Sequence, residues 1–440
     1  MKTLKDVLAA LAYTGYALLS YVIAVGAAIW AAPRQHFESF FFLAFIVLYL
    51  LLYAGVLRLV RPSRKGGLRI IKAIAGFAVF GFLSAAMLIP GDRERQAAPD
   101  TLQYWSLPTG SVLSYIHIEA EASAAGRKST PVIFLHGGPG IPDFPGDSRY
   151  FGQLAQDGYD VYVYSQLGSG FSTRLENPAG YGVERDARDL EEIRKQIGAD
   201  KMILIGHSYG SEVIARYMVD YGEHVDRAAF LSPGAMDPQD HSDATLTQRL
   251  DSSQKWKLYR HLLHPRALFV YGLLQFHPDA ARSFASDDEM DRRFEAVYAA
   301  TAPALYCSGD QGHSGLSGLG FYANQTPQSL AAGNHYDPRP LLSEKHFTLP
   351  VLIAKGGCDY LSWESAEDYR RVFPNSKLVY LPEAGHNLYQ EQPDVMMGIL
   401  REFLESGTGK LQGYEGRVPP EDYQGARAAR KKNEHGHEIG

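Results

Sequence analysis

The spacing of apolar residues divides the chain into two parts. Residues 7–32, 39–60 and 70–90 form three nearly uninterrupted apolar runs. Each run is long enough to cross a bilayer core of about 30 Å as a helix. Buried helices of a water-soluble fold are the competing interpretation, but three such runs in succession, with almost no charge inside, favour membrane spans. We therefore predict a three-span transmembrane region over residues 1–92.

The basic residues predict how these spans are oriented. The connection between the second and third runs is rich in basic residues, whereas the first connection carries only Arg34, close to Glu38. The basic residues of the second connection are Arg58, Arg61, Arg64, Lys65, Arg69 and Lys72. Basic connections stay in the cytoplasm, so the N-terminus should be cytoplasmic and everything after Pro90 should lie outside. We thus expect an integral protein of a bacterial inner or plasma membrane with an extracytoplasmic main domain. A signal peptide over the first run is an alternative that leaves this placement unchanged.

From about residue 101 the pattern changes to short apolar strands that alternate with amphipathic helices. In the stretch 183–197, for example, charges lie on one helical face and apolar residues on the other. We expect strands at 111–120, 131–135, 160–165, 201–205, 227–232, 350–355 and 377–381, and helices at 183–197, 211–221 and 394–405. This alternation predicts an α/β fold with a mostly parallel sheet covered by helices on both faces.

The segment between the strands at 227–232 and 350–355 is too long for a bare connection. It is rich in aromatic residues and helical periods, so we interpret residues 234–345 as a helical cap over the C-terminal edge of the sheet. The core then comprises residues 100–233 and 346–406. The last segment, 407–440, is polar, with glycine, proline and mixed charge, and we predict that it is disordered or loosely attached.

Composition adds limits to this picture. The 440 residues are 45% hydrophobic with a formal net charge of -6, which suits a globular protein and gives no indication of nucleic-acid binding. The two cysteines, Cys307 and Cys358, rule out a disulfide-built scaffold. A single bridge between them is an alternative, but we favour two buried free thiols. No group of histidine, cysteine and carboxylate residues has the spacing of a metal site.

One pentapeptide indicates nucleophilic chemistry. Gly206-His207-Ser208-Tyr209-Gly210 fits G-x-S-x-G and stands between an expected strand and an expected helix. That context is typical of a nucleophile elbow, a sharp turn that lifts the Ser208 hydroxyl clear of the sheet. Side chains at the flanking positions would collide with neighbouring backbone, which explains the two glycines. The N-terminus of the following helix favours negative charge developing at this place.

A serine hydroxyl needs a base, and the base needs an orienting acid. In folds with this elbow the acid and the histidine follow the serine in that order. Asp359 comes just after the strand at 350–355, and His386 just after the strand at 377–381. One strand–helix–strand unit separates the two, which should bring both beside Ser208. Nearby carboxylates suit the role less well: Glu364, Asp368 and Glu383.

Backbone groups complete the expected site. An oxyanion hole needs two N–H donors, and we assign them to Tyr209, directly after the nucleophile, and Gly138, in the glycine-rich loop after the strand at 131–135. We expect His136 to hold that loop by hydrogen bonding and His207 to be structural. Cys358 lacks a base, so we assign it to packing.

Taken together, several phrases resemble the proline iminopeptidase branch of the α/β-hydrolases. They are HGGPG, SQLGSGFS, GHSYGS, GGCD, AGHN and, in the cap, GFYANQ. The resemblance covers roughly residues 100–405 and leaves the membrane spans out. It implies a core sheet with an inserted helical cap, no metal or cofactor, a Ser208–Asp359–His386 triad, and Gly138 and Tyr209 as oxyanion donors. One departure is Ser165, where such proteins usually have aspartate, and it puts a local loop contact in doubt.

The substrate is less well specified by the sequence. Proline iminopeptidases bind the free amine of a peptide through cap carboxylates. This cap offers Asp287, Asp288, Glu289, Asp291 and Glu295, although we favour a solvated helix face for this run. Aromatic residues of the cap could line an acyl pocket, but most should be cap core: Trp256, Tyr259, Phe269, Tyr271 and Phe276.

Three functions therefore stand as hypotheses. The first is a membrane-anchored serine peptidase that removes N-terminal residues from short peptides. The second is an esterase or lipase acting on acyl or lipid-derived esters near the bilayer. The third is a non-catalytic membrane protein that uses the fold for binding, against which the complete serine, aspartate and histidine set argues. The expected partners are a small-molecule or short-peptide substrate and the lipid bilayer.

Overall fold

A computed structural model of the chain describes most of the region after residue 97 and parts of the N-terminal region. The described residues are 15, 18–19, 21–32, 43, 46–47, 50–51, 81–91, 97–121, 126–240, 242–307, 316, 318–330 and 336–425. Most of the three predicted spans lies outside them. In the described part of the chain, no helix combines the length and the apolar character that a membrane crossing needs.

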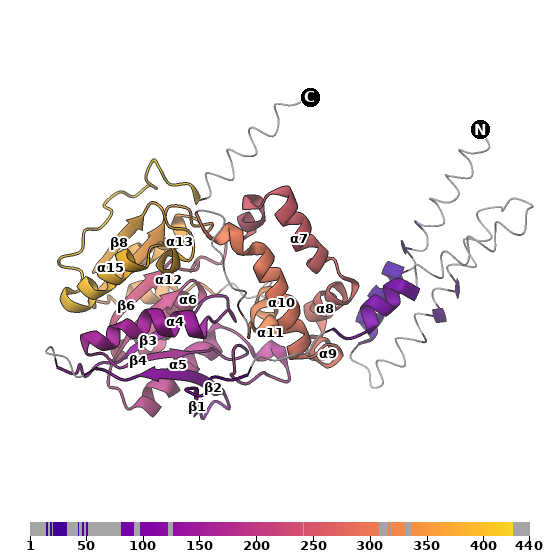
Figure 1. Ribbon diagram of the computed structural model, residues 1–440, viewed down its shortest axis with the longest axis horizontal. Coiled ribbons are helices and arrows are strands. Elements are labelled where there is room, and N and C mark those ends of the chain that lie inside the picture. Colours follow the sequence, from indigo (N-terminus) through magenta and orange to yellow (C-terminus); the bar gives the residue numbers. More distant parts are fainter. Residues whose placement is uncertain are drawn as a thin grey trace, which may run out of the picture. The chain divides into compact units, whose positions relative to one another are not determined.

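An eight-stranded sheet forms the centre of the hydrolase-like region (Figure 1). The strand order is β1-β2-β4-β3-β5-β6-β7-β8. All neighbours from β4 to β8 are parallel, whereas β2 pairs antiparallel with both β1 and β4. The strands are β1 (Gln103–Ser106), β2 (Val112–Ile118), β3 (Val132–Leu135), β4 (Val161–Tyr164), β5 (Met202–His207), β6 (Val225–Leu231), β7 (Val351–Gly356) and β8 (Ser376–Leu381). The seven expected strands are confirmed, and β1 is an additional one.

Helices cover both faces of this sheet, as predicted. The central strands are buried on both faces of the sheet. Their sequences are therefore nearly continuous apolar runs and do not alternate between apolar and polar residues. On one face a core cluster joins the sheet to α4 (Phe144–Phe151) and α15 (Pro393–Ser406). The other face packs against α5 (Val183–Ile197), α6 (Tyr209–Tyr221) and α13 (Glu364–Val372).

The chain divides into two compact units that differ from the predicted domains. One unit contains residues 1–92 together with 260–289, and the other contains 93–259 and 290–440. The predicted cap, 234–345, is therefore split, because two of its helices associate with the N-terminal region. Within that first unit, a hypothetical Cβ on Gly272 would meet the side chain of Ile29.

The cap segment is helical, as predicted, apart from its short connections. Its helices are η4 (Ser242–Arg249), α7 (Ser252–Leu262), α8 (Pro265–Phe276), α9 (Pro278–Phe284), α10 (Asp287–Thr301), η5 (Ala302–Leu305), α11 (Phe321–Leu330) and α12 (Arg339–Glu344). The expectation that its aromatic residues are mostly core is confirmed for Phe269 at 1% exposure. It is wrong for Trp256 at 70%, Tyr259 at 42% and Phe276 at 69%, because these lie on exposed faces of α7 and α8.

The predicted disorder after residue 406 is wrong for residues 407–425. Leu411 and Tyr423 are buried, and the Tyr423 hydroxyl donates to the Leu361 carbonyl at 2.9 Å. A few aromatic and aliphatic anchors in an otherwise polar segment are enough to attach it to the core, which composition alone does not reveal. The remainder of that prediction, residues 426–440, lies outside the described residues.

Candidate active site

Ser208 occupies the sharp turn between β5 and α6. Its backbone has φ 52° and ψ -119°, a region that residues other than glycine rarely adopt. A Cβ on Gly206 would come within 2.7 Å of the Gly210 carbonyl, and a Cβ on Gly210 would collide with the Leu135 carbonyl of β3. Both glycines are thus required by the close packing of the turn, and the geometry is that of a nucleophile elbow.

Asp359 and His386 form a buried hydrogen-bonded pair. His386 Nδ1 donates to Asp359 Oδ1 at 2.9 Å, and the Leu361 N–H donates to the same oxygen at 3.1 Å. Asp359 Oδ2 accepts from Lys355 Nζ at 2.8 Å. Burial alone would raise the pKa of Asp359, but the Lys355 ammonium and His386 outweigh it and hold that pKa below its ordinary value. With Nδ1 as donor, Nε2 is the nitrogen of the neutral imidazole that can accept a proton.

His207 connects the nucleophile turn to the His386 loop. Its Nε2 donates to the His386 carbonyl at 3.1 Å, and the centroids of the two rings lie 4.9 Å apart. Burial, together with the nearby His386, lowers the pKa of His207 to about 3, so its ring is neutral. This contact agrees with the predicted structural role, and it places Ser208, the next residue, beside the loop that carries His386.

The glycine-rich loop after β3 lies directly against Ser208. A Cβ on Gly137 would come within 3.0 Å of the Ser208 Cβ, and Gly138 has φ 125°, where a side chain would be strained. His136 Nδ1 donates to the Gly137 carbonyl at 2.8 Å, while its Nε2 accepts the Gln166 N–H at 3.0 Å. Burial lowers the pKa of His136 to about 4, as a neutral acceptor ring requires. The prediction that His136 holds this loop is confirmed.

The loop is also held from the cap side by α11. Asn324 Nδ2 donates to the Pro139 carbonyl at 2.7 Å, and the Gly320 N–H donates to the Gly140 carbonyl at 2.7 Å. Both donors belong to GFYANQ, one of the phrases on which the resemblance to proline iminopeptidases rests. The contacts explain why this phrase accompanies a glycine-rich loop: the helix fixes the backbone of that loop.

Ser165 stands where the sequence departs from the usual aspartate. Its Oγ is buried, and no hydrogen-bond partner for it lies among the described residues. The neighbouring Gln166 still joins the two loops, because its Nε2 donates to the His136 carbonyl at 3.0 Å. The connection between the loops is therefore present with serine at position 165.

The cap returns to the core beside the acid and histidine loops. The His386 N–H donates to the Leu305 carbonyl at 2.7 Å, and Asn387 Nδ2 donates to the Tyr306 hydroxyl at 2.7 Å. Tyr306 in turn donates to Gln390 Oε1 at 2.7 Å. The position of His386 thus depends on Leu305, the last residue of η5, and on Tyr306, which follows it.

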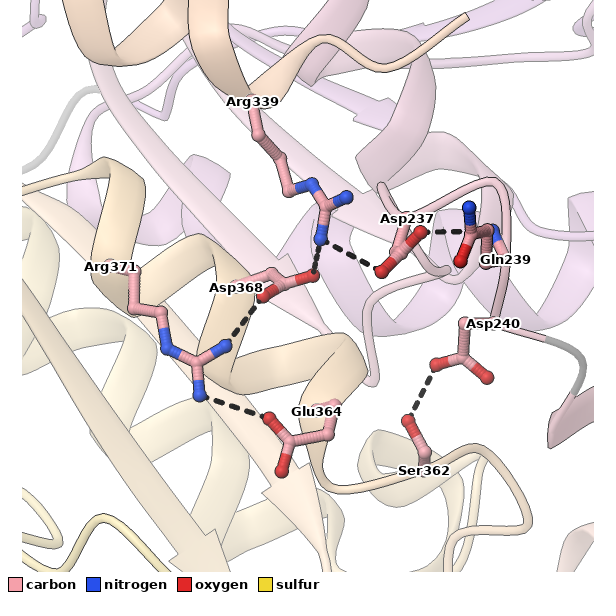
Figure 2. A pocket seen from close by; sticks show the side chains of 8 residues that line it. All are labelled: Asp237, Gln239, Asp240, Arg339, Ser362, Glu364, Asp368 and Arg371. Carbon is pink, nitrogen blue, oxygen red and sulfur yellow. Dashed lines mark hydrogen bonds and ion pairs between the residues drawn. The ribbon is translucent and has the colours of Figure 1, made fainter. Parts of the chain in front are cut away.

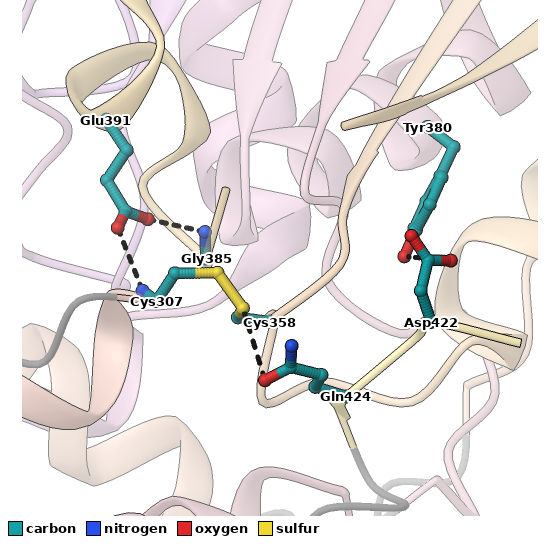
Figure 3. The surroundings of a disulfide bond; sticks show 7 residues. All are labelled: Cys307, Cys358, Tyr380, Gly385, Glu391, Asp422 and Gln424. Carbon is teal, nitrogen blue, oxygen red and sulfur yellow. Dashed lines mark hydrogen bonds between the residues drawn. A yellow bond between two sulfur atoms is a disulfide. The ribbon is translucent and has the colours of Figure 1, made fainter. Parts of the chain in front are cut away.

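A disulfide also attaches the cap segment after η5 to the loop that carries Asp359. Cys307 is bonded to Cys358, which precedes Asp359, and Figure 3 shows Glu391 beside the bridge, accepting the N–H groups of Cys307 and Gly385. Our preference for two free thiols is wrong. The Cα atoms are 5.2 Å apart across a sequence separation of 51 residues, and the folded cap creates this proximity, which lies within the usual range for a disulfide.

Two of the alternative acids, Glu364 and Asp368, line a pocket away from the predicted triad. A pocket of about 300 Å³ contains Glu364 and Asp368 but none of the three predicted triad residues (Figure 2). Arg371 donates to Asp368 at 2.8 Å and to Glu364 at 3.0 Å, and Arg339 donates to Asp368 at 2.8 Å. These carboxylates are engaged by arginines, so Asp359 is the acid that reaches His386. The pocket is lined by Asp237, Gln239, Asp240, Arg339, Ser362, Glu364, Asp368 and Arg371.

Among the described residues, ion pairs hold at least four of the cap acids, so the expected solvated face is wrong for them. Their pairs are Asp287 with Arg282 at 2.9 Å, Glu289 with Arg266 at 2.6 Å, Asp291 with Arg174 at 2.9 Å and Glu295 with Arg292 at 3.1 Å. Asp291 and Glu295 also accept the backbone N–H groups of Phe321 and Gly318, at 2.8 Å each. These acids stabilise the cap through contacts with arginines and backbone N–H groups. Such contacts cannot be inferred from a run of charged residues in the sequence.

Sequence reasoning missed Lys355 and Asn324 as parts of the site. Lys355 gave a usable signal, because it is the one charged residue in the otherwise apolar phrase PVLIAKGG. Asn324 gave only membership in a family-like phrase. In the described part of the chain, no group of three or more histidine, cysteine or carboxylate residues is arranged to hold a metal ion.

Several known proteins are similar to this chain in sequence or in fold. A proline iminopeptidase of Heyndrickxia coagulans is 26% identical over 279 residues, which are 63% of this chain and 91% of that protein. The 1-acylglycerol-3-phosphate O-acyltransferase ABHD5 of Pongo abelii is 25% identical over 295 residues, 63% of this chain and 78% of that protein. An alpha/beta fold family hydrolase from Bacillus anthracis str. Sterne has the same fold, with a TM-score of 0.50 and 17% identity over 69% of this chain and 98% of that one.

The family model described as alpha/beta hydrolase fold matches residues 130–393. This range includes the elbow, both loops that carry Asp359 and His386, and the intervening cap. The chain belongs to the alpha/beta hydrolase fold family and is a serine hydrolase of that family.

Proposed function

We propose that the protein is a membrane-anchored serine hydrolase that acts through an acyl-enzyme and releases N-terminal residues from short peptides. The observation that carries the catalytic part is the 2.9 Å hydrogen bond between His386 and Asp359, next to the strained turn of Ser208. Support for the peptidase part comes from the relative in Heyndrickxia coagulans, a proline iminopeptidase of which the chain covers 91%.

In this mechanism, His386 Nε2 removes the proton of the Ser208 hydroxyl while Asp359 keeps the imidazole in the required tautomer. The serine oxygen attacks the substrate carbonyl, and the N–H groups of Gly138 and Tyr209 donate to the oxyanion. His386 then returns the proton to the leaving amine, which departs. Water, deprotonated by His386, attacks the ester carbonyl, and cleavage of the Ser208 ester bond releases the acid and restores the hydroxyl.

An esterase or lipase is the second candidate, and two observations favour it. The cap carboxylates that would attract a substrate amine are already occupied: Asp291 by Arg174 and a backbone amide, and Glu295 by Arg292 and a backbone amide. The relative in Pongo abelii carries the name of an acyltransferase for an acylglycerol phosphate. An ester substrate near a bilayer would use the same serine and the same oxyanion donors without an amine contact.

A substrate panel separates the two candidates. Proline amide, other aminoacyl amides and short acyl esters are offered to the full chain and to Ser208→Ala. We expect turnover of aminoacyl amides by the wild type and a loss on the order of 10³-fold or more in Ser208→Ala. Ser232→Ala is a matched control, because Ser232 is a buried serine directly after the neighbouring strand β6, and its hydroxyl has no hydrogen-bond partner among the described residues. Ester turnover without any amide turnover would reject the peptidase assignment, and full activity of Ser208→Ala would reject the mechanism.

We also propose that the apolar N-terminal runs anchor the enzyme with the hydrolase domain outside the cytoplasm. The distribution of basic residues supports this orientation. The Cys307–Cys358 bond supports it independently, because structural disulfides are typical of oxidising compartments. A reporter enzyme that is active only outside the cytoplasm, fused after Pro90, should be active. Activity of a cytoplasm-dependent reporter at the same junction would reverse the assignment.

A further inference from the structure

Lys355 is a fully buried cation within the candidate site. It lies near the end of β7, four positions before Asp359, and the side chains of both residues are 0% exposed. Its Nζ donates to three oxygens: Asp359 Oδ2 at 2.8 Å, the Leu361 carbonyl at 3.2 Å and Ser365 Oγ at 3.2 Å. An ammonium group has three N–H donors, so each of them has an acceptor.

Burying the Lys355 ammonium costs free energy, and its contact with Asp359 indicates a role in the candidate site. Removing an ammonium from water costs several kcal/mol unless its partners compensate. Asp359 does not need the lysine to be oriented, since Oδ1 already accepts from His386 and from the Leu361 N–H. The chain nevertheless places the cation on the second oxygen of the one carboxylate that binds the candidate catalytic base.

We propose that Lys355 is a positioning residue that sets the effective charge of Asp359 and thereby the pH range in which His386 acts as a base. The ammonium neutralises part of the carboxylate charge on the side away from His386. A proton arriving on His386 therefore gains less from Asp359, and the imidazole stays neutral to lower pH. This inference rests on the proposed roles of Ser208, Asp359 and His386.

Other charged or titratable groups face these three side chains, and the comparison must hold them constant. Arg249 and Tyr423 face Asp359, and Asp240 faces Lys355. His207 faces both His386 and Asp359, and the Tyr360 ring lies 4.7 Å from the His386 ring, measured between centroids. Because a substitution at Lys355 leaves these five groups in place, a change in the pH profile reports on the lysine.

The test compares Lys355→Met with the wild-type full chain. kcat/KM for the best substrate of the panel, and the rate at which a fluorophosphonate labels Ser208, are measured from pH 5 to pH 9. We expect the acidic limb of both profiles to move to higher pH by about one pH unit. Lys377→Met is the matched control: this lysine lies on the adjacent strand β8 and pairs with the exposed Glu415. Its acidic limb should not move.

The position of the acidic limb distinguishes tuning from a structural role. A folded Lys355→Met protein that is slower at every pH, with its limb where the wild type has it, would overturn the proposal. If that variant does not fold, ¹⁵N-lysine NMR of the wild type decides: a protected ammonium signal from Lys355 at pH 8 supports the proposal, and a neutral amine at pH 7 overturns it. Failure of the proposed function is seen separately, as undiminished activity or labelling in Ser208→Ala.

Discussion

A buried carboxyl next to the nucleophile makes the stability of the protein depend on pH. Asp186 of α5 accepts a hydrogen bond from the Tyr209 hydroxyl at 2.7 Å. Burial raises the pKa of Asp186 to about 8, although the bond from Tyr209 opposes this. In the unfolded chain the same group ionises above about pH 4. Between these values the folded state holds one proton more, so the free energy of unfolding falls as pH rises.

Asp186→Asn should remove this dependence. The amide keeps an acceptor for Tyr209 but cannot ionise, so the variant should gain stability relative to wild type as pH rises from 4 to 8.5. Four pH units at about 1.4 kcal/mol each give an expected relative gain of about 5 kcal/mol, measured by denaturant unfolding at several pH values. Asp220→Asn is the control, because Asp220 is an exposed helix residue paired with Arg216. Parallel stability curves for wild type and Asp186→Asn would contradict the assignment.

The sequence predicted residues whose local context is sufficient and missed those defined by contacts in space. Ser208 is recognisable because its glycines are required by the turn itself, and Asp359 and His386 because each follows a strand in a fixed order. Lys355 acquires its role from a carboxylate in the next turn and from Ser365 of α13. Asn324 acquires its role from a loop 185 residues away in the sequence. Its neighbours along the chain carry no sign of that contact.

At the scale of elements, the buried parallel strands were predictable because each is a continuous apolar run. β1 was missed because its four residues, Gln103–Ser106, are mostly exposed at the sheet edge. α4 was missed because Pro145 and Gly146 near its start indicate a turn. In the structure Pro145 occupies the first turn of that helix, where its missing N–H costs nothing, and Asp143 caps it by accepting from Gly146. Helix and cap signals are therefore present in the sequence, although no helix was predicted from them.

The Cys307–Cys358 bond should support both stability and catalysis, because it joins the cap return to the acid turn. Replacing both cysteines by serine should lower the free energy of unfolding by about 2–4 kcal/mol. It should also lower kcat, since Asp359 follows Cys358 directly and the His386 N–H bonds to cap residue Leu305. Thermal unfolding and kinetics check both effects.

A reducing agent provides the control for this prediction. Treating the wild type with dithiothreitol should reproduce the behaviour of the double serine variant, and the double variant should not respond to the treatment. Mass spectrometry confirms that the bond was reduced. Unchanged activity and melting temperature in the reduced wild type would show that the non-covalent contacts of the cap return suffice.

At the scale of the molecule, the local sequence pattern indicates a core and an inserted helical cap. It does not indicate the division into the two compact units. The sequence presented residues 234–345 as one insertion, because the two core strands that flank it are easily recognised. In the structure, 260–289 associate with residues 1–92. Arg266 of α8 explains this: it donates to the Met87 carbonyl at 3.0 Å and to Glu289 at 2.6 and 2.8 Å. A polar clamp of this kind leaves no periodicity in the sequence.

Arg266→Met should therefore destabilise the unit formed by residues 1–92 and 260–289. Arg266 is 1% exposed and Glu289 is 0% exposed, so the substitution leaves a buried carboxylate without its cation and removes the donor to the Met87 carbonyl. Breaking a buried pair from one side costs about 3–5 kcal/mol. Hydrogen–deuterium exchange of the detergent-solubilised full chain should show faster exchange in residues 260–289, with little change around Ser208.

Two further variants test whether the Arg266–Glu289 ion pair itself stabilises this unit. Arg282→Met removes a more exposed arginine, with a side chain 31% exposed and paired with Asp287 in the same unit, and should cost less than about 1 kcal/mol. Arg266→Met combined with Glu289→Leu replaces both charges by apolar groups and should recover part of the lost protection, because no unpaired charge remains buried. Equal hydrogen–deuterium exchange rates in residues 260–289 of Arg266→Met and Arg282→Met would contradict the proposed role of Arg266. A double variant no more protected than Arg266→Met would place its importance in the backbone carbonyl contacts instead.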